Sequence, residues 1–148
     1  MLTDLSAKDP RLNYEPFLFI LLIHADWIIH HLNGNEKIVE KLASLKDEGL
    51  AISVISLAEL YEGVYYSTDP VGNEQALKDF LMGMPVLGID EEICEIFGKE
   101  RGRLRKEGRI IGDFDLLIAS TCLYHNLVLL SNNRKHYEVV EELKVVSI

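Results

Sequence analysis

Cysteine and long apolar runs are both scarce in this 148-residue chain. Cys94 and Cys122 are its two cysteines, and they form no Cys-x-x-Cys pair. The longest apolar run, FLFILLI at 17–23, has seven residues, whereas a helix that spans a bilayer needs roughly twenty. These shortages argue against a disulfide-rich secreted fold and against a transmembrane segment. We expect a reduced, cytoplasmic protein with no membrane segment.

Phosphate-binding glycine motifs and excess positive charge are also missing. The chain has neither GxGxxG after an apolar run nor GxxxxGK[ST], so the common nucleotide-phosphate loops are excluded. Fifteen Lys and Arg stand against twenty-four Asp and Glu, for a net charge of −9. Such a surface repels a nucleic-acid backbone at long range. A protein of this charge that acts on nucleic acid needs cations at its acidic site or a basic partner.

What the sequence does contain is a regular alternation of short apolar runs and amphipathic stretches. This alternation predicts an α/β fold, with a parallel sheet of about four to five strands and helices on both faces. Residues 1–16 are polar and without period, which predicts a poorly ordered N-terminal extension before one domain over 17–148. The expected strands are 17–23, 51–55, 85–89, 127–130 and 144–148, and the expected helices are 27–33, 35–48, 57–67, 73–82, 91–107 and 114–125.

Metal-capable side chains gather where these runs end. An open parallel sheet binds its ligands beyond the carboxyl ends of its strands, and polar residues follow the first, second and fourth runs and open the helix before the fourth. They are His24, Asp26, Glu59, Asp113, Asp115 and Asn133. Carboxylate and amide oxygens bind Mg²⁺ and Mn²⁺. The convergence of these residues predicts an acidic metal site.

Each acid also has a purely structural interpretation. Asp26 could cap the helix 27–33, and Ser56 with Glu59 has the spacing of a capping box. Asp113 could cap the helix 114–125, with Asp115 as an acid that the helix dipole favours.

Asp115 nevertheless favours the functional interpretation. Ile118, Ala119 and Cys122 lie three, four and seven residues further on, so one helix face carries all four side chains and aims the carboxylate inward. A buried carboxylate stays ionised only beside a cation or a helix N-terminus.

Other polar residues are weaker candidates. A basic stretch precedes Asp113 and could hold a phosphate backbone, although a solvated helix face is the better explanation for most of its residues. The stretch comprises Lys99, Arg101, Arg103, Arg105, Lys106 and Arg109. The remaining histidines lack ligand spacing and are interpreted as structural or surface residues; they are His30, His31, His125 and His136. Asp90 is expected to cap the helix 91–107.

Four segments resemble the PIN domain family, in particular the VapC-type toxin ribonucleases. They are LLIHADWIIHHLNG, AISVISLAELYEGV, KERGRLRKEGRIIGDFDLLIAS and LVLLSNNRKHY. The resemblance implies a three-layer PIN-like fold and a metal-dependent endoribonuclease that uses Mg²⁺ or Mn²⁺. It further implies the toxin of a type II toxin–antitoxin pair, a homodimer with a small antitoxin as partner. Glu59, Asp115 and Asn133 match the family's positions after the second strand, at the penultimate helix and after the fourth strand.

The first of these segments departs from the family pattern. His24 stands where the family has its first-strand aspartate, and Asp26 falls on the family's second polar position. Asp26 therefore either replaces the missing ligand or acts beside His24. Because imidazole suits transition ions better than it suits magnesium, the substitution predicts either a shifted metal preference or a catalytically impaired domain that binds RNA or protein. A receiver-type phospho-switch is disfavoured, because the aspartate after the third run, Asp90, is expected to start a helix and no lysine of the required kind stands out after a later strand.

Overall fold

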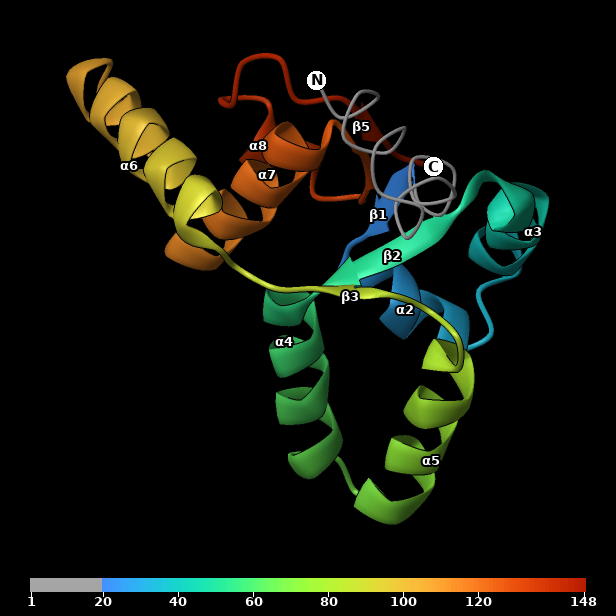
Figure 1. The fold of residues 1–148 in the computed structure, drawn as a ribbon. Coiled ribbons are helices and arrows are strands. Elements are labelled where there is room, and N and C mark those ends of the chain that lie inside the picture. The colour runs from blue at the N-terminus through green and yellow to red at the C-terminus, as the bar shows by residue number, and fades with distance from the viewer. Residues whose placement is uncertain (1–19) are drawn as a thin grey trace, which may run out of the picture.

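The computed structural model describes residues 20–148, so the expected extension over residues 1–16 lies outside the described part. Five parallel strands form one sheet in the order β3-β2-β1-β4-β5 (Figure 1). The strands are β1 (Leu21–Ile23), β2 (Leu50–Ser53), β3 (Val86–Leu87), β4 (Val128–Leu130) and β5 (Val145–Val146). The predicted α/β class and parallel sheet are confirmed.

The helices connect these strands in chain order. They are α2 (Ala25–Leu32), α3 (Glu36–Leu45), the short 3₁₀ helix η3 (Lys46–Glu48), α4 (Val54–Tyr65), α5 (Pro70–Leu81), α6 (Glu91–Lys106), α7 (Asp113–His125) and α8 (Arg134–Tyr137). Within residues 20–148, no helix combines the length and the apolarity that crossing a bilayer requires.

Helices cover both faces of the sheet because side chains along each strand alternate between the two faces. Leu21 and Ile23 of β1 pack with buried residues of α2, α3, α4 and α5. Leu22, between them, packs on the opposite face with buried residues of α6, α7 and α8. The two apolar cores make the three-layer arrangement that the sequence predicted, and they fix the helix ends near the sheet edge.

Three helices begin earlier than the sequence suggested, which changes the role of their acids. His24, Ser53 and Gly112 are the residues at the N-caps of α2, α4 and α7. The interpretations of Asp26 and Asp113 as caps are therefore wrong. The capping box at Ser56 is wrong as well, because the Ser53 side chain accepts the Ile55 amide at 3.1 Å.

Two other helix starts follow the expected chemistry. Asp90 caps α6 by accepting the Ile93 amide at 2.9 Å, as predicted. The helix α5 begins at Pro70 rather than at 73, because Asp69 caps it and proline suits the first helical position, where its missing N–H costs nothing.

Candidate active site

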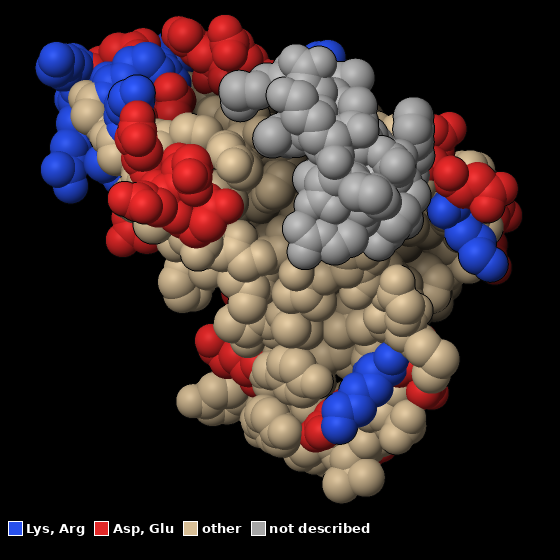
Figure 2. All heavy atoms as spheres, in the orientation of Figure 1, with Lys and Arg blue, Asp and Glu red and all other residues tan. Residues whose placement is uncertain are grey.

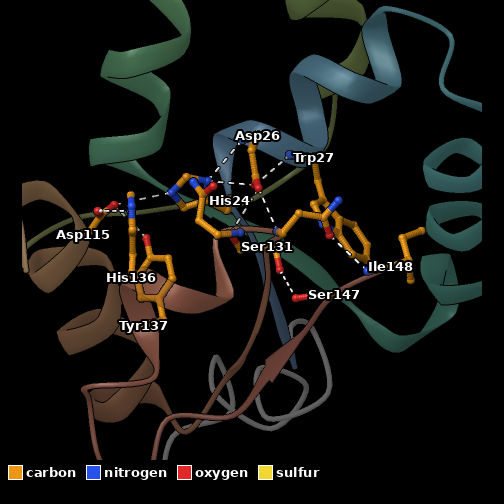
Figure 3. A network of polar contacts seen from close by, with 11 residues as sticks. His24, Asp26, Trp27, Asp115, Ser131, His136, Tyr137, Ser147 and Ile148 are labelled. Carbon is orange, nitrogen blue, oxygen red and sulfur yellow. Dashed lines mark hydrogen bonds and ion pairs between the residues drawn. The ribbon is translucent and has the colours of Figure 1, made fainter.

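The polar residues collect beyond the carboxyl ends of β1 and β4, the two strands between which the strand order reverses. In parallel α/β sheets this is the place at which ligands bind. The His24 amide donates to the carbonyl of Leu130 at 3.0 Å, which ties the end of β1 to the end of β4. The N-terminus of α7 brings Asp115 to the same network (Figure 3).

Asp26 is held by hydrogen bonds on both of its oxygens. Its Oδ1 accepts the Trp27 amide at 2.9 Å, and its Oδ2 accepts the Asn132 amide at 2.8 Å and the Ser131 hydroxyl at 3.2 Å. Burial alone would raise the pKa of Asp26, but the contact with His24 and these amides outweigh burial and lower it. Asp26 is therefore an ionised carboxylate whose oxygens already have partners.

His24 lies buried between two carboxylates, with 5% of its surface exposed. Its Nδ1 is 2.8 Å from Asp26 Oδ1, and its Nε2 is 3.7 Å from Asp115 Oδ1. The rings of His24 and Tyr137 form a T-shaped pair, with ring centroids 5.7 Å apart. Burial by itself would lower the pKa of His24, but the surrounding carboxylates outweigh burial and raise it to about 9.

The contact at 2.8 Å shows that Nδ1 of His24 carries a proton whether the ring is neutral or charged. An ionised carboxylate has no proton to give, so Nδ1 must donate to Asp26 Oδ1. The Asp26 amide also lies 3.1 Å from Nδ1, but a protonated ring nitrogen cannot accept it. The other nitrogen, Nε2, points toward Asp115 at an ion-pair distance that is too long for a hydrogen bond.

Asp115 receives contacts from three aromatic side chains. Tyr137 donates its hydroxyl to Oδ1 at 3.0 Å, and His136 Nδ1 lies 3.2 Å from Oδ2. His24 contributes most to lowering the pKa of Asp115; burial opposes this, and the Tyr137 hydroxyl reinforces it. The predicted inward direction of this carboxylate agrees with the burial of Ile118 and Ala119 on the same face of α7.

Glu59 approaches the cluster from α4, and its carboxylate has fewer hydrogen-bond partners than that of Asp26. Its Oε1 is buried and has no hydrogen-bond partner. Burial raises the pKa of Glu59 most; the charge of His24 lowers it, and the charges of Asp115, Glu62 and Asp26 raise it. Glu59 is thus an acid that lacks the compensating contacts of Asp26.

Two predicted residues are placed differently from the rest. The Asp113 side chain is 78% exposed and accepts from Arg101 Nη2 at 2.6 Å, on the outer side of α7. Asn133 is exposed at the start of α8, where its side chain makes no capping bond. Its backbone carbonyl accepts the His136 amide at 3.0 Å, so Asn133 lies next to the network without joining it through its side chain.

Sequence reasoning missed two residues of this network, His136 and Tyr137. Both belong to α8, a four-residue helix whose sequence is too short for periodicity to reveal. A signal was present nevertheless, because they come six and seven residues after the end of the predicted strand 127–130, close enough in the chain to lie near the same sheet edge.

The donor atoms can be tested for their fit to a divalent ion. Among residues 20–148, no three His, Cys, Asp or Glu side chains already form a ligand cage. Four buried side-chain polar atoms in this part of the chain have no hydrogen-bond partner: His24 Nε2, Glu59 Oε1, Ser56 Oγ and His31 Nδ1. Two of them belong to the cluster, and Ser56 lies one helical turn before Glu59. Unpaired buried polar atoms are rare and costly. The unpaired atoms of His24 and Glu59 therefore fit a divalent ion that is bound by imidazole and carboxylate groups.

The basic stretch divides into paired and exposed residues. Figure 2 shows Lys and Arg side chains gathered over α6, next to acidic ones. Arg103 pairs with Glu100 and Glu107, and Lys99 pairs with Glu95. The helix-face interpretation therefore holds for these two, while Arg105 and Lys106 remain exposed.

Comparison with known proteins places this fold and site in a family. A PIN domain profile matches residues 25–142. Ribonuclease VapC1 of Haemophilus influenzae strain R2866 is 32% identical over 127 residues, which cover 84% of this chain and 95% of that protein. The tRNA(fMet)-specific endonuclease VapC of Shigella flexneri is 29% identical over 106 residues, covering 72% of this chain and 80% of that protein.

A solved structure agrees with these sequence relationships. The crystal structure of VapBC2 from Rickettsia felis, bound to a DNA fragment from their promoter, contains a chain that is 29% identical. That chain matches with a TM-score of 0.82, over 88% of this chain and 99% of its own length. With most of both chains covered in sequence and in structure, the protein belongs to the PIN domain family and is a relative of the VapC ribonucleases.

Proposed function

We propose that the protein is a VapC-type endoribonuclease, the toxin of a toxin–antitoxin pair, which hydrolyses RNA phosphodiester bonds at the acidic cluster. The observation that carries this proposal is the buried, unpaired Nε2 of His24 at 3.7 Å from Asp115 Oδ1, together with the unpaired Oε1 of Glu59, whose charge interacts with those of His24 and Asp115. The names of its relatives, ribonuclease and tRNA-specific endonuclease, support RNA as the substrate class.

Each residue of the cluster has a different role in this proposal. Glu59, Asp115 and His24 would hold a divalent ion, Mg²⁺ or Mn²⁺, and Asp26 would support them from the first turn of α2. When bound, such an ion activates water and neutralises the charge that develops on the phosphate. Tyr137 and His136 fix the orientation of Asp115 through its two oxygens. The exposed amide of Asn133, one turn from His136, is placed to contact the RNA at the open edge.

The partner proposal follows from charge. A net charge of −9 would hinder the approach of RNA but favours a basic protein arm over the acidic cluster. A VapBC complex is among the structural relatives. We therefore propose a small antitoxin that covers this site and, as in the sequence-based expectation, a homodimer of the toxin.

RNA cleavage by matched variants tests the proposed function. Purified protein is incubated with a mixed RNA pool that includes tRNA, in EDTA, Mg²⁺ or Mn²⁺. Parent protein should cut only with metal, and Asp115→Asn and Glu59→Gln should lower the rate by a factor on the order of 10² to 10³, as removal of one charge-stabilising group typically does. Glu62→Gln is the control, because Glu62 is exposed one turn further along α4.

Two results would contradict the proposal. One is a parent protein that cuts no RNA with either ion. The other is cleavage by Asp115→Asn and Glu59→Gln at the parent rate, which would indicate a contaminating nuclease or another site.

A further inference from the structure

The geometry points to His24 as a direct imidazole donor to the metal and to Asp26 as the residue that positions it, so that this centre binds a first-row transition ion in preference to Mg²⁺. This inference rests on the proposed function, because it concerns the ion at the same site. It assigns Asp26 a role different from the ligand role expected from its sequence position.

The first step concerns the orientation of the His24 ring. Asp26 Oδ1 accepts from Nδ1 at 2.8 Å, and Asp26 is itself held by Ser131 and the Asn132 amide. Histidines that bind metals almost always donate their other ring N–H to a carboxylate or carbonyl in this way. The arrangement leaves Nε2 as the nitrogen that can release its proton to solvent and bind an ion.

The second step concerns what Nε2 faces. It is buried, has no hydrogen-bond partner, and lies 3.7 Å from Asp115 Oδ1. Glu59 adds a second buried and unpaired donor atom, Oε1, from α4. Figure 3 shows the His24 ring extending from Asp26 on one side toward Asp115 on the other.

The third step concerns why Asp26 is a poor ligand. Its two oxygens already accept from Trp27, Ser131 and the Asn132 amide in addition to His24. Binding an ion through Asp26 would break contacts that join the first turn of α2 to the loop after β4. Asp115 and Glu59 can bind one without that loss.

The fourth step concerns the choice of ion. Mg²⁺ requires near-ideal octahedral geometry and is bound through oxygen atoms. Imidazole raises the affinity for transition ions, and this affinity increases in the order Mn²⁺, Fe²⁺, Co²⁺, Ni²⁺. One imidazole with two carboxylates therefore favours Mn²⁺ or a later ion over Mg²⁺.

Mn²⁺ provides a direct readout of the donor atoms. Full-length protein is freed of metal with EDTA and dialysed, and Mn²⁺ and Mg²⁺ affinities are measured by calorimetry. Pulsed electron paramagnetic resonance then reports whether a ¹⁴N nucleus is bonded to Mn²⁺. The variants are His24→Asp, His24→Asn and Asp26→Asn, with His30→Gln as control, because His30 is exposed on the same helix.

The parent and His30→Gln should bind Mn²⁺ more tightly than Mg²⁺ and show the ¹⁴N coupling. Both His24 variants should lose the coupling, and His24→Asp should shift the preference toward Mg²⁺. His24→Asn adds no charge, so it covers the case in which a further carboxylate prevents folding. Asp26→Asn should keep the coupling but weaken Mn²⁺ binding about 10- to 100-fold, the usual effect of losing such a partner.

The failures of the two proposals can be told apart. Mn²⁺ bound without ¹⁴N coupling, or the same ratio of affinities in parent and His24→Asp, would overturn the role of His24. If that parent still cuts RNA with Mg²⁺, the proposed function survives. A parent protein that binds neither ion and cuts no RNA would contradict both proposals.

Discussion

Two carboxylates at the same edge of the sheet, Asp26 and Glu59, differ in their hydrogen-bond partners and in the direction of their pKa shifts. On the side of β1 and β4, Asp26 has partners for both oxygens and a pKa lowered despite burial. On the side of α4, Glu59 has a buried oxygen without a partner and a pKa raised mainly by burial. An acid whose oxygens are satisfied contributes to the structure, whereas an acid left unpaired in a buried place is available for a ligand.

The largest effect should come from replacing Asp26, the carboxylate whose two oxygens both have partners. Asp26→Ala removes the partner of a buried His24 and leaves the Asn132 amide and the Ser131 hydroxyl without their acceptor. Removing one member of a buried ion pair typically costs about 3 to 5 kcal/mol. We expect the free energy of unfolding to fall by about that amount, measured by urea denaturation in EDTA.

The matched control is Asp79→Ala, because Asp79 lies on α5, remote in sequence from the site, and bonds a side chain of its own helix. If Asp26→Ala unfolded at the same urea concentration as this control, the assignment of Asp26 to a structural role would be wrong.

The second effect is a dependence of stability on pH in the metal-free protein. Asp26, Asp115 and Glu59 face His24 and raise its pKa to about 9, against about 6.5 in an unfolded chain. Protonated His24 therefore stabilises the fold. This contribution is fully present below pH 6.5 and is lost as the pH rises through 9.

From these pKa values the loss should be about 3 kcal/mol between pH 6.5 and 9. Urea titrations at several pH values in EDTA would measure it. His24→Asn should show a much flatter profile over the same range, and an equally steep profile in that variant would mean that another group is responsible.

A smaller effect of opposite sign on the free energy of unfolding is expected at Glu59, whose Oε1 has no partner. Because burial raises the pKa of Glu59, its ionised form at pH 7 destabilises the metal-free fold. Glu59→Gln should therefore leave the unfolding free energy unchanged or raise it by up to about 1 kcal/mol, while RNA cleavage falls. Thermal melts in EDTA would show this, and a clear loss of stability would imply that Glu59 has structural contacts.

The sequence predicted the sheet and its covering helices because short apolar runs and their alternation are local features. It also predicted which strand ends carry polar residues. It could not predict the roles of Asp26, whose partners Ser131 and Asn132 are more than a hundred residues away. Nor could it place the starts of α2 and α4, because each of these helices begins directly where the strand before it ends, with His24 and Ser53 as the N-caps.

Asp113 illustrates the same limit at shorter range. Asp113 and Asp115 are two residues apart in the first turn of α7, so their side chains leave the helix in different directions. Arg101 binds Asp113 on the outer side, and His24 lies beside Asp115 on the inner side. Spacing alone did not distinguish the half-buried acid, Asp115, from the surface acid, Asp113.

The smallest effect should therefore come from Asp113→Asn. With 78% of its side chain exposed, its pair with Arg101 should contribute less than about 1 kcal/mol to stability. Mn²⁺ affinity and RNA cleavage should stay near the parent values, measured beside Asp115→Asn under the same conditions. If Asp113→Asn lost metal binding as completely as Asp115→Asn, both acids would have to face the ion, and α7 would have to rotate when metal binds.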